Sequence, residues 1–340
     1  MKRSIIIFCV SLIFFIACAP ADMLWGSPYY EKKVIYIIVG GNPGGGYDRT
    51  ARLMGKYLSK YIPGHPSIVI QNMAGGGGGG SMIAANYLYN VAKPDGMTVG
   101  TLNRYLALEQ LVKSEGVKFD MAKYSWIGSA ATEASVFTVR SDLPYKSIDD
   151  FLKAKTQIYV AVSGGLTTAT QFTPILMDFL GDRVKYVTYI SSAEIMLALE
   201  RKEVDCYGFT YSTAKLLIGR GILRPLMRGN VIEPGMENLP ANVDITADPK
   251  TKNIINMLSS IDQMGRPFIA PRGVPEPVLK ILREAFAQVI KDPALKEDCK
   301  KLNIALEYTK TEDCLKIVNN ILNQPNETVE KLNKYVNFIK

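Results

Sequence analysis

The sequence is poor in the residue types on which many active sites depend, with one histidine among its 340 residues. That residue, His65, stands in the turn Pro63–Pro66, so histidine-dependent triads and multi-histidine metal sites are not available. No Gly-x-Ser-x-Gly elbow occurs, and the adjacent Asp149 and Asp150 fall at a predicted helix start, where the helix dipole accounts for acidic residues. We therefore expect no enzyme, no cofactor and no bound metal.

Long apolar runs are also rare, and the clearest one is at the N-terminus. Lys2–Arg3 precedes the run Ile5–Ala17, which is too short to span a bilayer comfortably but has the length of a signal-peptide core. The cleavage site stays open between a lipoprotein signal ending before Cys18 and small-residue cleavage at Ala19–Ala21. We assign residues 1–21 to a signal peptide, which predicts a periplasmic protein or one anchored by lipid to the extracytoplasmic side of a bacterial membrane.

Cysteines are few, and their spacing fits no zinc or redox motif. Beyond the signal the chain has Cys206, Cys299 and Cys314. An oxidising compartment would permit a bridge between Cys299 and Cys314, which the sequence leaves open. We interpret Cys206, on a predicted strand, as a small core residue.

The excess of positive charge is modest. The formal net charge is +8, and removal of Lys2 and Arg3 with the signal leaves 38 basic against 32 acidic residues, or +6. The basic residues are scattered through predicted helices without interleaved aromatics, so we expect no nucleic-acid partner.

Strands and helices alternate along most of the chain, which predicts an α/β fold with parallel sheets. In the first hundred residues strands at 34–39, 67–71 and 97–102 alternate with helices at 51–61 and 81–91. A second alternation runs from 147 to 227, and helices dominate the end of the chain. We predict one lobe from residues 29–131 plus 253–340, another from 135–250, and hinges near Ala131–Ser135 and Gly229–Pro249.

Three glycine-rich stretches each follow a predicted strand and precede a helix: Gly40–Arg49, Ala74–Ser81 and Ser163–Thr168. Neither of the first two is a Walker motif, because no Gly-Lys-Ser/Thr follows the glycines. Arg49 also stands where the dinucleotide fingerprint needs glycine or alanine. A nucleotide is therefore not the expected ligand.

Such loops suit a carboxylate, because glycines allow several backbone N–H groups to point the same way at a helix start. Asp48 either caps its helix or recognises a hydroxyl or amine of the ligand. Ser163, Thr167 and Thr168 could donate to an anion or cap the next helix. Arg104, just after the strand at 97–102, is the best candidate for a charged contact.

Four motifs together resemble a known family. They are Pro43–Arg52, Val69–Gly75 leading into the glycine run, Ala92–Gly96, and Gly265–Pro275. The combination is similar to the solute-binding proteins of tripartite tricarboxylate transporters, the Bug family. The chain departs from the family pattern at Tyr189–Ser192, where Tyr-Lys-Gly is usual, and it lacks the aspartate often found late in the stretch that begins at Val204.

The resemblance implies a two-lobed periplasmic binding protein fold of type II, a "Venus flytrap" with the ligand cleft between its lobes. It also implies a small carboxylate ligand, held largely through backbone groups and water and handed to the integral membrane subunits of a tripartite transporter. We expect a monomer. Two alternatives stay open, a ligand-sensing lipoprotein that signals to a membrane kinase and a secreted α/β enzyme. The predicted ligand-binding residues are Asn42, Gly44, Gly45, Gly46, Tyr47, Asp48, Gly77, Gly78, Gly79, Gly80, Ser81, Asn103, Arg104, Ser163, Gly164, Gly165, Thr167 and Thr168.

Overall fold

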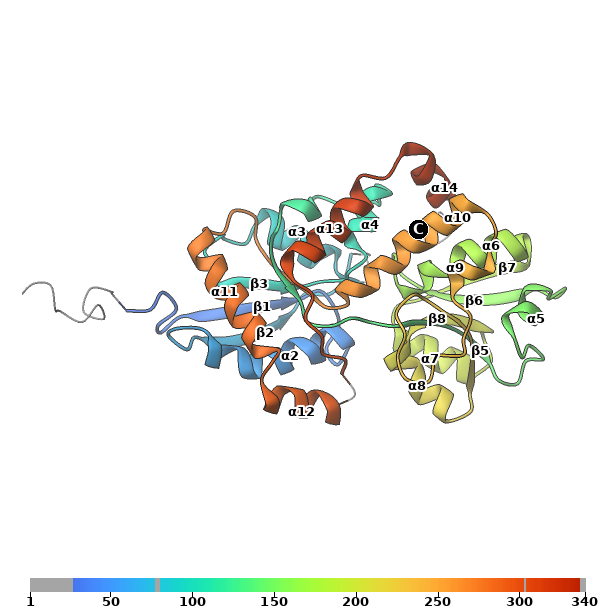
Figure 1. The fold of residues 1–340 in the computed structure, drawn as a ribbon, viewed down its shortest axis with the longest axis horizontal. Helices are drawn as coiled ribbons and strands as arrows, with labels where there is room; N and C mark the ends of the chain where they lie inside the picture. Colours follow the sequence, from blue (N-terminus) through green and yellow to red (C-terminus); the bar gives the residue numbers. More distant parts are fainter. Residues whose placement is uncertain (1–26, 77–79, 303, 337–340) are drawn as a thin grey trace, which may run out of the picture.

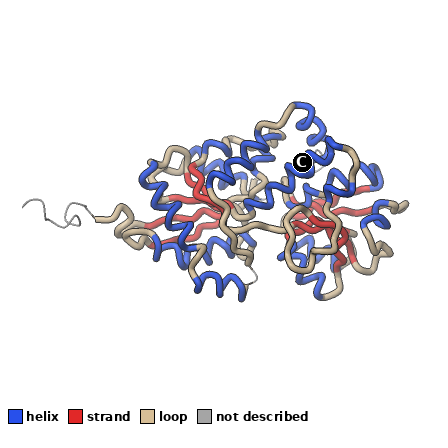
Figure 2. Tube along the Cα trace, in the orientation of Figure 1, coloured by secondary structure: helices blue, strands red, loops and turns tan. Residues whose placement is uncertain are grey.

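The computed structural model describes residues 27–76, 80–302 and 304–336. The predicted signal peptide with Cys18, and the predicted site residues Gly77, Gly78 and Gly79, lie outside the described residues. The chain forms two lobes side by side along its long axis, each built on a five-stranded sheet (Figure 1). Helices cover both faces of each sheet, as the tube in Figure 2 shows.

The sheet of the first lobe has the strand order β2-β1-β3-β10-β4. Its first three strands are parallel, as predicted, whereas β10 runs antiparallel to both of its neighbours. The direction of β10 follows from the chain path, because this strand arrives from the second lobe. The strands are β1 (Val34–Val39), β2 (Ser67–Asn72), β3 (Thr98–Thr101), β4 (Ser125–Ser129) and β10 (Pro267–Ala270).

Alternation along β1 distributes its side chains between two cores. Ile35 and Ile37 belong to the core beneath α2, α11 and α12, whereas Ile38 belongs to the core beneath α3, α4 and α13. The helices are α2 (Gly46–Leu58), α3 (Met82–Asn90), α4 (Leu106–Leu111), α11 (Glu276–Val289), α12 (Pro293–Lys301) and α13 (Thr311–Leu322); short 3₁₀ turns occur at η2 (Ser59–Tyr61) and η4 (Met121–Lys123).

The second lobe repeats this plan with the strand order β7-β6-β8-β5-β9. β6 is parallel to β7 and β8, and β5 is antiparallel to β8 and β9 because it arrives from the first lobe. Its elements are β5 (Ser135–Arg140), α5 (Ile148–Leu152), β6 (Ile158–Ser163), η5 (Thr168–Gln171), α6 (Thr173–Leu180), η6 (Gly181–Arg183), β7 (Val184–Tyr189), α7 (Ser192–Glu200), β8 (Cys206–Thr210), α8 (Tyr211–Gly219), β9 (Leu223–Arg228) and α9 (Asn242–Ile245).

The chain passes between the lobes in the segment from β4 to β5 and returns through α10 (Pro249–Ser260) and η7 (Ile261–Met264) (Figure 1). The first crossing includes the predicted hinge Ala131–Ser135. The second predicted hinge is misplaced, because Gly229–Pro249 packs on the second lobe, with Met236 fully buried in its core. Sequence reasoning missed α10 because its polar composition resembles that of the surface connection before it.

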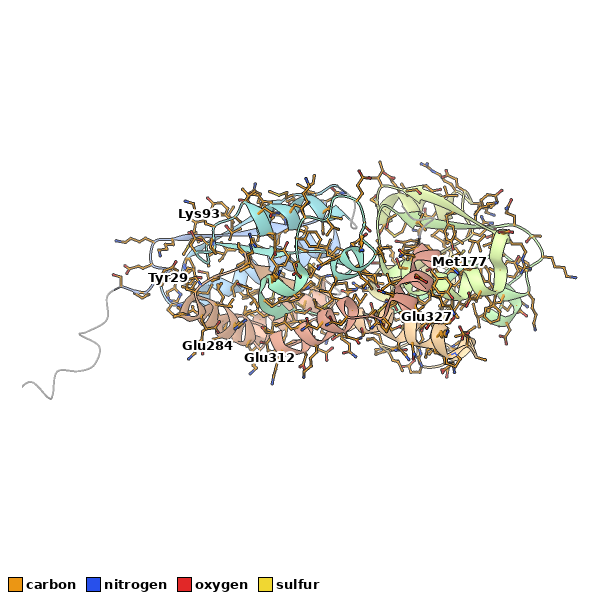
Figure 3. The ribbon with its side chains drawn as sticks, turned by 90° about the horizontal axis from the view of Figure 1, so that it is seen from above. Tyr29, Lys93, Met177, Glu284, Glu312 and Glu327 are labelled. Atoms are coloured by element: carbon orange, nitrogen blue, oxygen red, sulfur yellow. The ribbon has the colours of Figure 1, made fainter. Side chains whose placement is uncertain are left out.

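The last helix, α14 (Asn326–Val336), contacts α6 of the second lobe and α10. The Tyr335 hydroxyl lies 3.0 Å from each carboxylate oxygen of Asp178 on α6. Figure 3 shows Glu327 of α14 and Met177 of α6 at the same end of the molecule. The sequence grouped this helix with the first lobe, whereas its polar contacts reach the second.

The three cysteines in the described chain are free and buried. Cys299 lies in the core beneath α2 and α11 and Cys314 in the core on the opposite face of the first sheet, so the bridge that the sequence left open is not formed. Burial raises the pKa of Cys299 to about 11 and that of Cys314 to about 12. Over the ranges that the structure describes, no helix combines the length and apolar character that crossing a membrane requires.

Candidate ligand-binding site

The first glycine-rich loop is joined to the second and to the end of β3 by one serine. Ser81 donates a hydrogen bond to the carbonyl of Gly40 and accepts one from the backbone N–H of Asn103 at 2.9 Å. A side chain at Gly40 would place its Cβ 2.4 Å from Ser81 Oγ, so the contact requires glycine. Ser81 stands at the start of the helix predicted at 81–91, but its side chain makes no cap hydrogen bond to α3.

Asp48 closes the first loop onto the start of α2. Its Oδ2 accepts hydrogen bonds from the backbone N–H of Gly44 at 2.8 Å and from Arg52 Nε at 2.9 Å. Burial alone would raise the pKa of Asp48, but the hydrogen bonds from Arg52 and Gly44 hold it below its ordinary value. The N-cap of α2 is Gly45, so Asp48 does not cap the helix as expected; it ties the first turn of α2 to Gly44 in the loop. Its contact with a ligand stays a prediction. The other oxygen, Oδ1, is buried without a hydrogen-bond partner in the described chain.

The two described ends of the second loop contact each other. The Gly75 N–H donates to the Gly80 carbonyl at 2.8 Å, and both glycines have positive φ. Gly80 is followed directly by Ser81, whose hydroxyl contacts Gly40.

Asn103 and Arg104 carry contacts from the end of β3 to the second lobe. Asn103 Nδ2 donates to the Leu166 carbonyl at 3.1 Å, and Arg104 Nη2 donates to Thr168 Oγ1 at 3.1 Å. The backbone N–H of Arg104 donates to the Tyr47 hydroxyl at 3.0 Å, which ties this position to the first loop. Arg104 is thus a buried contact between the lobes.

The third loop holds its own helix start and faces the first lobe. The N–H of Thr167 donates to Thr170 Oγ1 at 3.1 Å, and Gly165 has a φ of +82°. The structure therefore brings parts of all three loops together at the lobe boundary. Within this group Asn42, Gly44, Gly45 and Gly164 are exposed.

Charged residues that the sequence did not single out also lie at the lobe boundary. The carboxylate of Asp262, on η7, accepts hydrogen bonds from Arg104 at 3.0 Å and from Ser135 Oγ at 2.5 Å. Burial raises the pKa of Asp262, and the hydrogen bonds from Arg104 and Ser135 oppose that rise. Asp262 follows Arg104 by 158 positions in the sequence, so nothing local marks the pair.

A second ion pair lies beside the first. Arg266 Nη2 is 2.7 Å from Glu133 Oε1, and the Arg266 guanidinium stacks 4.6 Å from the centre of the Tyr47 ring. An added Cβ at Gly46 would lie 2.6 Å from Arg266 Nη2, which explains glycine at that position of the first loop. Two buried cations are thus matched by two buried anions at the lobe boundary.

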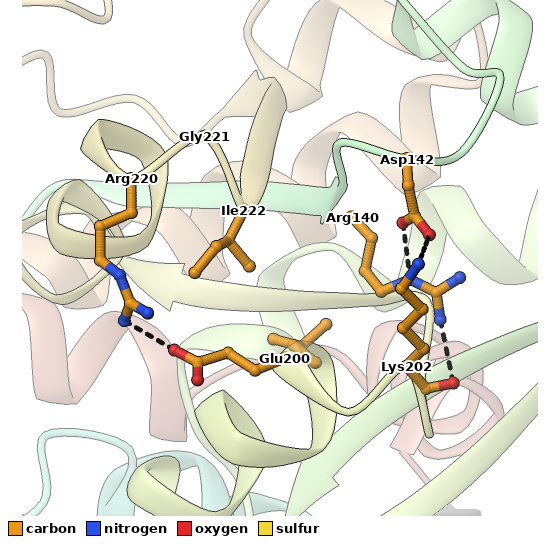
Figure 4. Close-up of a pocket in the computed structure, with 8 residues that line it drawn as sticks. Arg140, Asp142, Glu200, Lys202, Arg220, Gly221 and Ile222 are labelled. Carbon is orange, nitrogen blue, oxygen red and sulfur yellow. Dashed lines mark hydrogen bonds and ion pairs between the residues drawn. The ribbon is translucent and has the colours of Figure 1, made fainter.

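A hollow of about 360 Å³ in the second lobe contains none of the predicted site residues. It lies where β5, α7 and α8 end, and Figure 4 shows its charged side chains paired with one another. Arg140 and Lys202 bind Asp142 at 3.0 and 2.9 Å, and Arg220 binds Glu200 at 2.7 Å. Because β5 starts at the lobe boundary and ends at Arg140, the hollow is at the far end of the sheet. Because the charged side chains of this hollow already pair with one another, we do not assign the ligand to it.

Comparison with solved structures gives the fold. The periplasmic binding protein BugD superposes with a TM-score of 0.70 at 19% identity, over 90% of this chain and 98% of that chain. Rpa4515 of Rhodopseudomonas palustris with adipate gives 0.68 at 20% identity, over 90% and 97%. MatC of the same organism with bound malate gives 0.66 at 17% identity, over 91% and 99%. The predicted two-lobed binding-protein fold is confirmed.

Comparison with protein families identifies the chain at the level of sequence. The model that matches describes the tripartite tricarboxylate transporter family receptor and covers residues 51–334. The match spans the second and third glycine-rich loops, both ion pairs at the lobe boundary and nearly all of α14. This chain therefore belongs to the tripartite tricarboxylate transporter receptor family.

Proposed function

We propose that this chain is an extracytoplasmic solute-binding protein that captures a small organic carboxylate between its lobes and delivers it to the integral membrane subunits of a tripartite tricarboxylate-type transporter. The observation that carries the proposal is the meeting of loops from both lobes, where Asn103 contacts Leu166 and Arg104 contacts Thr168. Membership of a receptor family supports the role. The malate and adipate bound to two relatives support the ligand class.

The chemistry available at the loops is that of hydrogen-bond donors more than that of free cations. Arg104 and Arg266 are each matched by a buried carboxylate, so neither adds net positive charge. The first loop opens into the 13-residue helix α2, whose N-terminal dipole favours an anion. We infer that backbone N–H groups and hydroxyls of the three loops hold the ligand, at the site residues predicted from sequence.

The proposal includes export and one membrane tether at most. Residues 1–21 would direct export, and Cys18 would carry a lipid if the lipoprotein signal is used. The exported chain would act as a monomer. Intact-mass measurement of the membrane fraction distinguishes an acylated Cys18 from a chain cleaved near Ala21.

The test is a thermal shift of the purified protein against di-, tri-, mono- and aromatic carboxylates, with nucleotides and divalent metals in parallel. A ligand at a hundred times its Kd stabilises the folded state by about 2.7 kcal/mol, which gives a readable shift. Gly164→Leu provides the site variant, because a Cβ there meets nothing within 4 Å and its φ is not positive. Gly219→Leu is the matched control, with the same open surroundings at the end of α8.

We expect a carboxylate to bind the wild-type protein and the control with equal affinity. It should bind Gly164→Leu at least about tenfold more weakly, because the added side chain blocks approach to the third loop. Stabilisation by a nucleotide or metal alone would contradict the ligand class. Equal affinity for all three proteins would move the site away from the third loop.

A further inference from the structure

Glu109 is a buried carboxylate at the boundary between the lobes, and no motif in the sequence marks it. The residue belongs to α4 of the first lobe and is 2% exposed. Its Oε1 accepts a hydrogen bond from the backbone N–H of Leu166 at 2.6 Å, across the boundary, and its Oε2 accepts one from the Ser114 hydroxyl. Both oxygens of the carboxylate are therefore engaged within the chain.

This contact falls in the middle of the third glycine-rich loop. A ligand carboxylate in the proposed site would be expected to use the N–H groups of that loop. The N–H of Leu166 is taken by Glu109, and the next N–H, that of Thr167, is taken by Thr170. The carboxylate of Glu109 therefore occupies an N–H donor of the third loop that a second ligand carboxylate would otherwise use.

Among the residues that the structure describes, the Glu109 carboxylate forms no ion pair that would offset its charge. The two buried arginines at the lobe boundary are committed elsewhere, Arg104 to Asp262 at 3.0 Å and Arg266 to Glu133 at 2.7 Å. Throughout the described residues, the hydrogen-bond partners of the Glu109 carboxylate are Leu166 N–H and the Ser114 hydroxyl, and it forms no ion pair. A like charge brought close to this buried carboxylate would be repelled strongly.

We propose that Glu109 is a specificity-determining residue of the ligand site, which excludes a second carboxylate from the third loop and selects monocarboxylates. The proposal rests on the proposed function. The single carboxylate would be held by the first loop, and the uncharged end of the ligand would meet the third loop, where Gly164 is exposed. The preference would separate this chain from the relatives solved with malate and adipate.

The experiment compares acids that differ by one carboxylate. Calorimetric titrations at pH 7.5 would use hexanoate against adipate and butyrate against succinate, on the wild-type protein, Glu109→Gln and Glu276→Gln. Glutamine keeps an acceptor for Leu166 N–H and removes the charge. Glu276 is exposed on α11 and pairs with Arg283, so its substitution removes the same net charge away from the site.

We expect the wild-type protein to bind each monocarboxylate at least about tenfold more tightly than its dicarboxylate partner, and Glu109→Gln to bring that ratio near one by strengthening the dicarboxylate. Monocarboxylate affinity should stay within about threefold, and Glu276→Gln should keep the wild-type ratio. A purely structural contact between the lobes would instead change both affinities by the same factor, which would overturn the proposal.

The wild-type ratio alone tests the inference, whether or not the variant folds. A preference for the dicarboxylate in both pairs would overturn the role of Glu109 and leave the proposed function standing. Binding of none of the four acids, while a nucleotide or metal binds, would overturn both.

Discussion

The buried pair of Arg104 and Asp262 gives a prediction whose size follows from the structure. The two side chains are 3% and 0% exposed, and their charged atoms lie 3.0 Å apart. At an effective dielectric constant of about 20, two unit charges at that distance attract by about 5–6 kcal/mol, which offsets the cost of removing both from water. Asp262→Asn or Arg104→Met alone leaves the other charge buried without its partner, so each should lower the free energy of unfolding by about 3–5 kcal/mol.

The double variant is the sharper part of this prediction. With both charges removed, no uncompensated ion remains, so the double variant should lose about as much stability as one single variant, or less. Equilibrium urea unfolding at pH 7 would measure this, with tryptophan fluorescence, to which Trp126 buried in the first lobe contributes, compared with circular dichroism of the whole chain. The two transitions must coincide for one free energy to apply.

Two results would refute the reasoning. One is a loss below about 1 kcal/mol for Asp262→Asn, which is the range of an exposed ion pair. The other is strict additivity in the double variant, since that would mean that the two groups do not depend on each other.

Three further outcomes follow from the geometry. Gly40→Ala should lower the free energy of unfolding, measured with urea, by about 1–3 kcal/mol, because its Cβ would lie 2.4 Å from Ser81 Oγ and overpack the site. Gly41→Ala, whose Cβ would meet nothing within 4 Å, should change that free energy by less than about 0.5 kcal/mol. Asp48→Asn should be less stable than the wild-type protein at neutral pH. Because the pKa of Asp48 is lowered in the folded state, its contribution to the free energy of unfolding is present above its ordinary pKa of about 4 and is lost as the pH falls through the folded value. The stabilities of the two proteins should therefore converge in acid unfolding curves. In a chain lacking residues 1–21, a thiol reagent at pH 8 should find no reactive thiol in the native protein and three after denaturation, because Cys206, Cys299 and Cys314 are buried; rapid native labelling would contradict their packing.

Local patterns were enough to predict most strands and the two-lobed class. The β-branched run of β1, and the alternation that puts Ile37 and Ile38 on opposite faces, indicate a strand covered on both sides. The antiparallel direction of β5 and β10 depends on how the chain crosses between the lobes, and a short stretch of sequence does not carry that information. The same holds for α14, whose Tyr335 reaches Asp178 across 157 positions.

The candidate site was predicted less completely than the fold. Glycines and hydroxyls after strands identified the loops, because parallel strands end at one edge of a sheet. Glu109, Glu133 and Asp262 were missed, since each is a single charged residue whose partner is far away in the sequence. The contact of Ser81 with Gly40 was missed for a related reason, because the two residues are 41 positions apart.

The most direct test of the central claim, that a carboxylate lies between the lobes against the three loops, is hydrogen–deuterium exchange with and without the acid that stabilises the protein most. Exchange should slow in peptides covering residues 40–48, 75–82 and 163–168, because the bound acid would cover these loops and lower their access to water. Peptides around Arg140, Lys202 and Arg220, which line the hollow in the second lobe, should be unchanged. Unchanged exchange in the three loops together with slowing at that hollow would contradict the claim.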